Sequence, residues 1–209
     1  MDYQIEREYK ENCKYEIING KLIIQNRLPS RNHSIVASNI YIKFVNYLKD
    51  KKCKAYKDDT HIRFDLTKKI KNIKVPDINQ KDRYRPDIMV VCDRTIDTID
   101  GIVGAPTLIV EVLSFSTMMY DKEIKKNLYA LIGVEEYWIV NPFDKSIEIY
   151  LLKNGKYVLS AIYGKHLRDE PDEGLGEKPE DFENFDEFSP FSFPDLKIKI
   201  DDVFEDIFE

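Results

Sequence analysis

The sequence predicts a protein of the α/β (α+β) class, in which β-strands alternate with two helices. Three observations support this. The chain has 209 residues, enough for one domain with a full core and too few for two domains of ordinary size. Apolar residues make up 43% of it and charged residues 33%, as in most globular proteins. Short β-prone runs bounded by turn residues recur, and two stretches of helical periodicity interrupt them. We therefore expect one domain over residues 1–209.

The N-terminal elements have clear local signals. Two β-prone runs flank Asn19-Gly20, and this dipeptide is the strongest two-residue hairpin signal, so a hairpin is predicted over 15–24. Ser30 is a suitable N-cap, and the apolar residues behind it recur at helical spacing. A helix over about 32–49 is therefore expected.

The middle of the chain carries the most apolar strands. The predicted elements are, in order, a basic loop over 51–57, an alternating strand over 61–66, a Lys-rich surface excursion over 67–84, buried strands over 87–92 and 107–113, a helix over about 118–132, a strand over 136–140, and a hairpin of 147–152 with 157–159. Ser116-Thr117 is expected to cap the second helix, and Gly133 to end it at the C′ position. Asn154-Gly155 is the turn signal of the last hairpin.

The C-terminal fifth differs from the rest in charge. The chain has a net charge of -6, but residues 1–167 hold 28 Lys and Arg against 22 Asp and Glu, whereas residues 168–209 hold 4 against 16. The net charge of the whole chain, taken alone, argues against a nucleic-acid partner, but residues 1–167 are mildly basic. Residues 169–188 are predicted to be an acidic, Phe-containing surface excursion. A final strand is expected over 191–200 and a short helical turn over 203–207.

Several classes of protein are not expected. No stretch approaches the roughly 18 apolar residues of a membrane-spanning helix, and the first 20 residues carry five acids and no apolar block, which disfavours a secretory signal. Cys13, Cys53 and Cys92 are odd in number and lack C-x-x-C spacing, so we expect reduced thiols in a cytoplasmic protein. With only three histidines, a His-rich metal site is not expected.

Two carboxylates stand out because they lie in apolar strands. Asp87 opens the strand that follows Pro86, and Glu111 lies in the middle of the most apolar strand, on the same face as Ile109 and Leu113. Burying an unpaired carboxylate is costly, so each needs a cation or another buried partner. A merely structural role remains open for both: Glu111 satisfied by an arginine or a backbone amide, and Asp87 as a turn residue after proline.

Lys125 is the third candidate. Asp121, Lys125, Tyr129 and Ile132 share one face of the predicted second helix. Because the last two prefer packing, this face is expected to turn toward the strand that carries Glu111. The alternative for Lys125 is an ion pair with Asp121 alone.

Two carboxylates and a lysine together are the groups that metal-dependent phosphodiester cleavage requires. Hard oxygen ligands bind Mg²⁺ or Mn²⁺. The metal lowers the pKa of a water and neutralises charge on the phosphate. A nearby lysine can orient or deprotonate the water, or stabilise the transition state.

An ordered series of segments resembles the Uma family of restriction endonucleases, within the PD-(D/E)XK nuclease superfamily. The likeness covers about 15–160 and resumes toward the C-terminus. The matching segments are Tyr15-Glu16 with Asn19-Gly20, His33, Arg85-Pro86-Asp87-Ile88, Gly104-Ala105-Pro106, Val110-Glu111-Val112-Leu113-Ser114, Ser116-Thr117, Asp121, Lys125, Tyr129, Gly133-Val134 and Glu136-Tyr137-Trp138-Ile139-Val140-Asn141-Pro142.

The resemblance implies a restriction-endonuclease-like mixed sheet flanked by helices, with Asp87, Glu111 and the backbone carbonyl of Val112 as ligands of Mg²⁺ or Mn²⁺. The superfamily usually places its lysine two residues after the second acid, where this chain has Leu113. Lys125 on the next helix takes that place. Glu16, His33, Asp121 and Tyr129 match family positions and are accessory candidates.

The leading hypothesis is therefore a Mg²⁺-dependent endonuclease acting on DNA, expected as a homodimer with no membrane association. The alternatives are a nucleic-acid-binding module of the same fold that cleaves weakly or not at all, and a structural domain whose C-terminal strand pairs between subunits.

Overall fold

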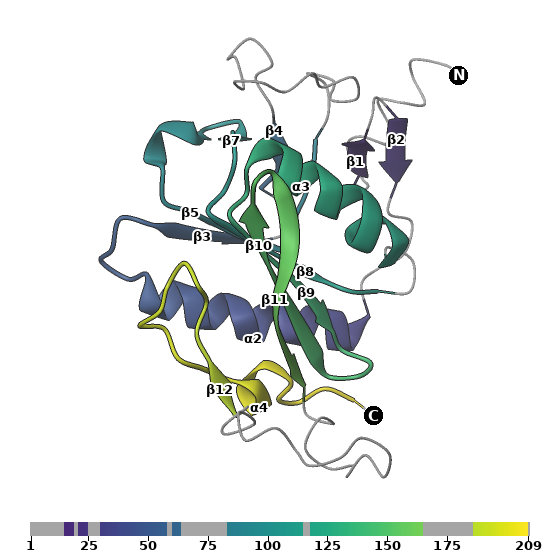
Figure 1. Cartoon of the computed structure of the whole chain (residues 1–209), viewed down its shortest axis with the longest axis vertical. Coiled ribbons are helices and arrows are strands. Elements are labelled where there is room, and N and C mark those ends of the chain that lie inside the picture. The colour runs from purple at the N-terminus through teal and green to yellow at the C-terminus, as the bar shows by residue number, and fades with distance from the viewer. Residues whose placement is uncertain are drawn as a thin grey trace.

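The computed structural model of the chain describes residues 15–18, 21–24, 30–57, 60–63, 83–114, 118–164 and 186–208. A mixed six-stranded sheet forms the centre of the molecule (Figure 1). β8 and β9 are parallel and the other neighbouring pairs are antiparallel. In spatial order its strands are β11 (Lys156–Gly164), β10 (Ser146–Lys153), β9 (Glu136–Asn141), β8 (Leu108–Val112), β5 (Ile88–Val91) and β3 (Lys54–Lys57). The predicted fold class is confirmed.

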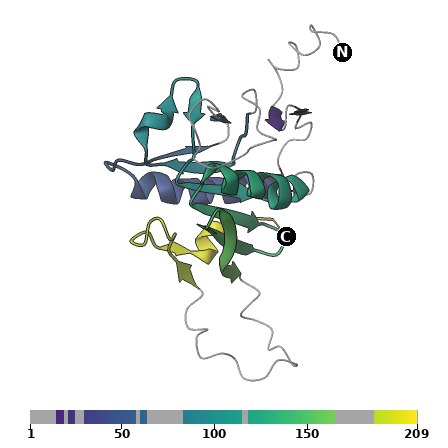
Figure 2. The same cartoon turned by 45° about the horizontal axis from the view of Figure 1, so that its top comes forward.

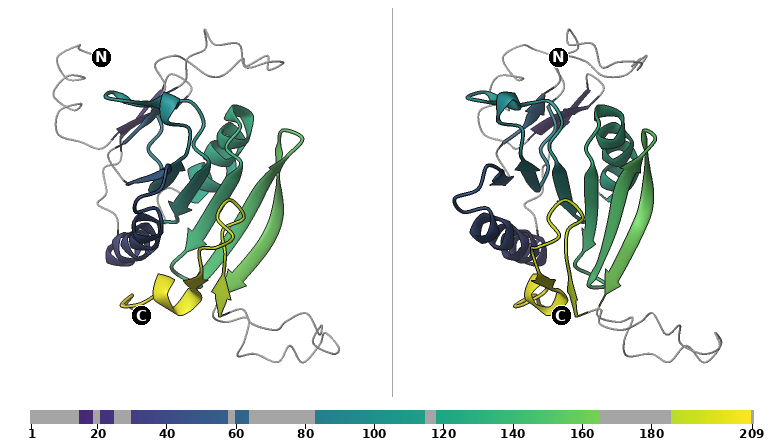
Figure 3. Two further views of the ribbon diagram at one scale, coloured as in Figure 1. Left: turned by 90° about the vertical axis from the view of Figure 1, so that its left-hand side faces the viewer. Right: turned by 60° about the vertical axis from the view of Figure 1, so that its left-hand side comes forward.

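Helix α2 (Arg31–Tyr47) covers one face of this sheet. Its N-cap is Ser30, whose side chain accepts a hydrogen bond from the His33 backbone N–H, as the sequence predicted. Val36, Ile40 and Phe44 of α2 are fully buried and pack in one cluster with the β8 residues Leu108, Val110 and Val112. Figure 3 shows α2 along one side of the strands, with the C-terminal helix α4 (Ile200–Val203) next to it.

The second helical segment covers the other face. It connects the parallel strands β8 and β9 and contains a π-helical stretch, η2 (Tyr120–Lys125), that continues as α3 (Lys126–Ile132). The helix predicted over about 118–132 is confirmed, and its π-helical part was not predicted. Gly133 ends α3 with φ 93°, the left-handed conformation that glycine adopts without strain. Ser116 and Thr117 lie outside the described residues.

Both predicted hairpins form. β1 (Tyr15–Ile18) pairs antiparallel with β2 (Lys21–Ile24). Between β10 and β11, Asn154 and Gly155 have φ 52° and 77°, the two positive values that a type I′ turn requires.

A smaller sheet lies beside the main one. It contains β4 (Ile62–Arg63), β7 (Gly101–Val103) and β6 (Asp97–Thr98), and the short helix η1 (Arg94–Ile96) precedes β6. Ile62 also bridges to Tyr84, and both side chains are fully buried. Figure 2 shows the segment from η1 to β7, in teal, at the opposite end of the molecule from α4, in yellow. The prediction of a surface excursion over 67–84 is therefore wrong at Tyr84. Residues 67–82 of that prediction lie outside the described residues, as do 64–66 of the predicted strand.

The C-terminal prediction needs correction. Within 191–200, only Ile198 and Lys199 are in a strand, β13, which pairs with β12 (Glu187–Phe188) of the same chain. Pro194 interrupts the apolar run and has no N–H to donate to a ladder. Of the predicted turn over 203–207, only Val203 belongs to the described helix α4. The prediction of an acidic surface excursion over 169–188 is wrong at its end, because Glu187 and Phe188 form strand β12 and Phe188 is buried in the core. Residues 169–185 of that prediction lie outside the described residues.

The C-terminal segment is instead bound to the face of the sheet that α2 covers. Phe193, Leu196, Ile198, Ile200 and Val203 belong to the same buried cluster as α2. Its apolar residues are therefore buried within the subunit.

The fully buried Glu136 at the start of β9 reinforces this attachment. Its Oε1 accepts the Trp138 indole N–H at 2.8 Å and the Phe191 N–H at 3.0 Å, and its Oε2 accepts the Ser192 N–H at 2.7 Å. Three N–H donors thus compensate a buried carboxylate at the point where the C-terminal segment meets the sheet.

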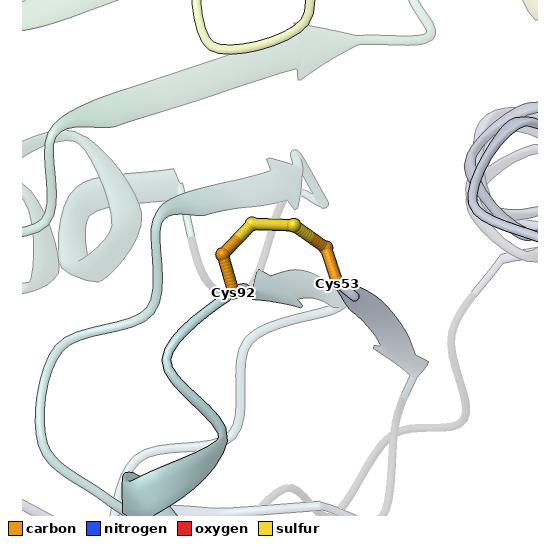
Figure 4. Close-up of a disulfide and its surroundings, with 2 residues drawn as sticks. All are labelled: Cys53 and Cys92. Carbon is orange, nitrogen blue, oxygen red and sulfur yellow. A yellow bond between two sulfur atoms is a disulfide. The ribbon is translucent and has the colours of Figure 1, made fainter. Parts of the chain in front are cut away.

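Two predictions about 51–57 and the cysteines are wrong. Residues 54–57 form edge strand β3 and not a loop. Cys53 and Cys92 are joined by a disulfide (Figure 4), because the β3–β5 register aligns Lys54 with Val91 and so sets the preceding and following residues opposite each other. This proximity depends on strand pairing, which the cysteine spacing did not reveal. Cys13 lies outside the described residues.

Among the described residues, no helix combines the length and the apolarity needed to span a membrane.

Candidate active site

The two predicted carboxylates lie side by side on neighbouring strands. In the antiparallel β5–β8 register Ile88 is paired with Val110, which sets Asp87 opposite Glu111. The Asp87 backbone N–H donates to Glu111 Oε2 at 3.4 Å. Pro86 restricts the preceding Arg85 to extended backbone, and the chain bends at Asp87 where it enters β5. Residues 24 apart in sequence thus form one acidic pair.

Strand alternation decides which way Glu111 points. Leu108, Val110 and Val112 belong to the cluster under α2, whereas Ile109 and Leu113 belong to the cluster under α3. Glu111 shares the second face and is 1% exposed. The predicted orientation of its strand is therefore confirmed.

Asp87 receives hydrogen bonds from two directions. Its Oδ2 accepts the Val112 backbone N–H at 2.8 Å and lies 3.1 Å from His33 Nε2, on the first turn of α2. Its side chain is 20% exposed, so this carboxylate reaches solvent while Glu111 does not. Burial alone would raise the pKa of Asp87, but His33, the Lys125 charge and the Val112 N–H together hold that pKa below its ordinary value.

Lys125 lies among three carboxylates. Its Nζ is 3.2 Å from Glu111 Oε1, 3.2 Å from Glu16 Oε1 and 3.3 Å from Asp121 Oδ1, and its side chain is 3% exposed. Burial by itself would lower the pKa of Lys125, but these carboxylates and Asp87 raise that pKa well above the ordinary value. Lys125 is therefore protonated at neutral pH. The pairing of Lys125 with Asp121 is one of three contacts with carboxylates. The alternative that Lys125 pairs with Asp121 alone is therefore wrong.

Tyr129 and Tyr137 complete the polar network. The Tyr129 hydroxyl donates to Glu111 Oε1 at 2.8 Å, and the Tyr137 hydroxyl donates to the Asp121 backbone carbonyl at 3.0 Å. Burial is the largest cause that raises the pKa of each tyrosine well above its ordinary value, so both remain hydrogen-bond donors. The Tyr137 contact was not predicted as part of the site, because it depends on how η2 packs on β9.

The N-terminal hairpin contributes Glu16. Besides its contact with Lys125, Glu16 Oε1 accepts the Arg85 backbone N–H at 2.8 Å, and the residue is 3% exposed. It therefore links β1 both to η2 and to the segment that leads to Asp87. The structure thus brings together all the predicted site residues: Glu16, His33, Asp87, Glu111, Val112, Asp121, Lys125 and Tyr129.

Comparison with known proteins agrees with this constellation. Residues 2–177 match the model of the Uma2 family, described as "Putative restriction endonuclease". The chain belongs to the Uma2 family. A relative from Synechocystis sp., "Uncharacterized protein slr1290", is 27% identical over 144 residues, 68% of each chain.

A solved structure shows the same fold. It is the crystal structure of "a putative nuclease belonging to DUF820" from Anabaena variabilis, with a TM-score of 0.59 and 20% sequence identity, over 91% of this chain and 89% of that one. The resemblance to restriction-endonuclease-type nucleases in the sequence is therefore confirmed at the level of family and fold.

The donor groups of this Uma2 chain fit a hard divalent cation. Four acidic side chains, Glu16, Asp87, Glu111 and Asp121, surround one lysine, and His33 adds positive charge only when protonated. Burial, opposed by Lys125 but reinforced by the other three acids, raises the pKa of Glu111 well above its ordinary value. The cluster thus carries more carboxylates than cations, and bound Mg²⁺ or Mn²⁺ would compensate the excess.

The number of side-chain ligands is small. Within the described part of the chain, no three His, Cys, Asp or Glu side chains converge as a metal site. Mg²⁺ commonly takes one or two carboxylates and keeps several waters, so Asp87 and Glu111 with one backbone carbonyl remain a suitable donor set. The Val112 backbone lies beside both carboxylates, since its N–H donates to Asp87.

Proposed function

We propose that this protein is a divalent-metal-dependent endonuclease that hydrolyses phosphodiester bonds in DNA. The observation that carries the proposal is the pairing of Asp87 with Glu111 across β5 and β8, with Lys125 Nζ 3.2 Å from Glu111. Membership of a family described as restriction endonucleases supports the reaction class.

In this proposal Asp87, Glu111 and the Val112 carbonyl hold Mg²⁺ or Mn²⁺. When bound, the metal supplies a Lewis acid that neutralises phosphate charge and lowers the pKa of a water. Asp87 is the more exposed of the two acids and so faces the substrate side. Tyr129 fixes the Glu111 carboxylate by donating to it.

Lys125 acts as a fixed positive charge in this scheme and not as a base. Three carboxylates within 3.3 Å of Nζ keep it protonated. A protonated ammonium can donate a hydrogen bond to a phosphate oxygen or to the attacking water and stabilise charge in the transition state, but it cannot accept a proton.

The test is a plasmid-cleavage assay with Mg²⁺ or Mn²⁺. Asp87→Asn and Glu111→Gln keep the side-chain shape and remove the charge. Each substitution should reduce the cleavage rate by roughly 10²-fold or more, because both carboxylates are proposed to bind the same metal ion. EDTA, which removes the metal, should abolish cleavage by the wild-type protein. The matched control is Asp195→Asn, at an exposed aspartate of the C-terminal segment, which should cleave as wild type does.

Fluorescence anisotropy with labelled duplex DNA separates this function from that of a binding module. The proposal expects Asp87→Asn to retain DNA binding while losing cleavage. If the wild-type protein binds DNA and does not cut it with any divalent metal, the proposal of an endonuclease is refuted.

A further inference from the structure

A strip of basic side chains borders the candidate active site. Ile62 in β4 is bridged to Tyr84, and both are fully buried in the cluster under α3. Neighbours in an extended segment point to the opposite face. His61 and Arg63 flank Ile62, and Arg83 and Arg85 flank Tyr84. The four side chains therefore lie on the face of the two paired segments that points away from the cluster under α3. We call these four residues the basic strip.

Two observations show that these side chains are close together. His61, Arg63 and Arg83 line the same cavity of about 510 Å³. After burial, the charges of Arg83, Arg63 and Arg85 are the next causes that lower the pKa of His61. Three arginines thus act on one imidazole, although the segments that carry them are separated by about 20 residues in sequence.

The basic strip is continuous with the candidate active site. The Arg85 backbone N–H binds Glu16, which pairs with Lys125. Arg85 also lies two residues before Asp87 in the same segment of the chain. The strip therefore adjoins the carboxylate proposed to hold the metal.

Among the described residues, two acids, Asp97 and Asp100, line the same cavity as Arg63. Asp97 is hydrogen-bonded to Tyr56 and pairs with Arg94 at 2.9 Å. Asp100 lies 3.6 Å from Arg63, but its side chain is 73% exposed. Exposed ion pairs contribute little, so a phosphate group can compete with Asp100 for Arg63.

We propose that the basic strip binds the phosphate backbone of the DNA strand next to the bond that is cut. This inference rests on the proposed function and deepens it, because it names the surface that positions the substrate. Arginine suits this role, since its guanidinium makes bidentate hydrogen bonds to phosphate.

The experiment measures the affinity for a fluorescein-labelled DNA duplex against salt concentration, between about 50 and 200 mM. The full-length double variant Arg63→Gln/Arg83→Gln should bind roughly tenfold more weakly and lose about one to two from the magnitude of the log–log salt slope, because each phosphate contact contributes about 0.9. The double variant Arg63→Lys/Arg83→Lys, which keeps both charges, should retain most of the slope.

The matched control removes the same charge elsewhere. Lys153 and Lys156 are exposed and face each other at the end of the β10–β11 hairpin, so Lys153→Gln/Lys156→Gln should leave slope and affinity unchanged. An equal loss in both double variants would show a general charge effect and overturn the inference.

A further variant covers the case in which the double arginine variant does not fold. Asp100→Asn removes an exposed acid beside Arg63 and should tighten DNA binding; unchanged or weaker binding counts against the strip. If the wild-type protein cleaves DNA and the arginine variants keep the wild-type salt dependence of DNA binding, the inference about the basic strip fails and the proposed function stands. If wild type neither binds nor cleaves DNA, the proposed function fails with it.

Discussion

Lys125→Met tests whether one lysine compensates the buried acids. The substitution keeps an unbranched side chain of similar length and removes the charge that lies within 3.3 Å of Glu16, Glu111 and Asp121. Removing one partner of a buried ion pair typically costs about 3–5 kcal/mol. For a chain of this size that corresponds to a decrease in Tm of roughly 6–20 °C.

The loss of stability in Lys125→Met should depend on pH, and the pKa shifts fix the direction of that dependence. The pKa of Lys125 is raised, so in wild type its stabilising contribution is present throughout the acid and neutral range and is lost only as pH rises through the folded-state pKa. The pKa of Glu111 is also raised and rises further without Lys125. The folded variant then binds a proton that the unfolded chain releases, and its stability falls with rising pH by about 1.4 kcal/mol per unit for each such proton. The deficit relative to wild type should therefore grow as pH rises through the folded-state pKa of Glu111 in the wild type.

Urea unfolding followed by the fluorescence of Trp138, the one tryptophan of the chain and fully buried, measures the free energy of unfolding. The control is Lys126→Met, at the next position, where Nζ lies 3.5 Å from the centroid of the Tyr150 ring. Such a contact contributes about 0.5–1 kcal/mol. The reasoning is refuted if Lys125→Met costs no more than Lys126→Met, or if its deficit grows as pH falls.

Two further predictions concern how the chain is held together. Glu136→Gln replaces one acceptor oxygen by an NH₂ group that faces N–H donors. It should lower the free energy of unfolding by about 1–3 kcal/mol and speed hydrogen exchange in the C-terminal segment. The exposed control Glu205→Gln should do neither, and unchanged exchange in Glu136→Gln would contradict the anchoring role. Cys53→Ala/Cys92→Ala opens a loop with a sequence separation of 39 and should cost about 3–4 kcal/mol; a reducing agent should lower the Tm of wild type but not of this variant, and free thiols in the oxidised wild-type protein would disprove the crosslink.

Some parts of this protein can be read from local sequence. Asp87 and Glu111 were recognisable because a charge inside an apolar strand is costly without a partner. The Asn154-Gly155 turn, the Ser30 cap and the Gly133 end of α3 were recognisable because each requires a backbone conformation that few residues adopt easily. These signals lie within a few residues of the features that they specify.

The tertiary structure alone decided what surrounds the acidic pair. Strand register brings Glu16 of the hairpin to Lys125 and sets Cys53 opposite Cys92, and the packing of α2 brings His33 to Asp87. Local propensity carries no information about which distant segments become neighbours, because that choice is made by the joint burial of apolar faces. The sequence therefore determined the two acids, their strands and the helix face that Lys125 shares with Asp121, and the fold determined the contact of Lys125 with Glu16 and the basic strip beside them.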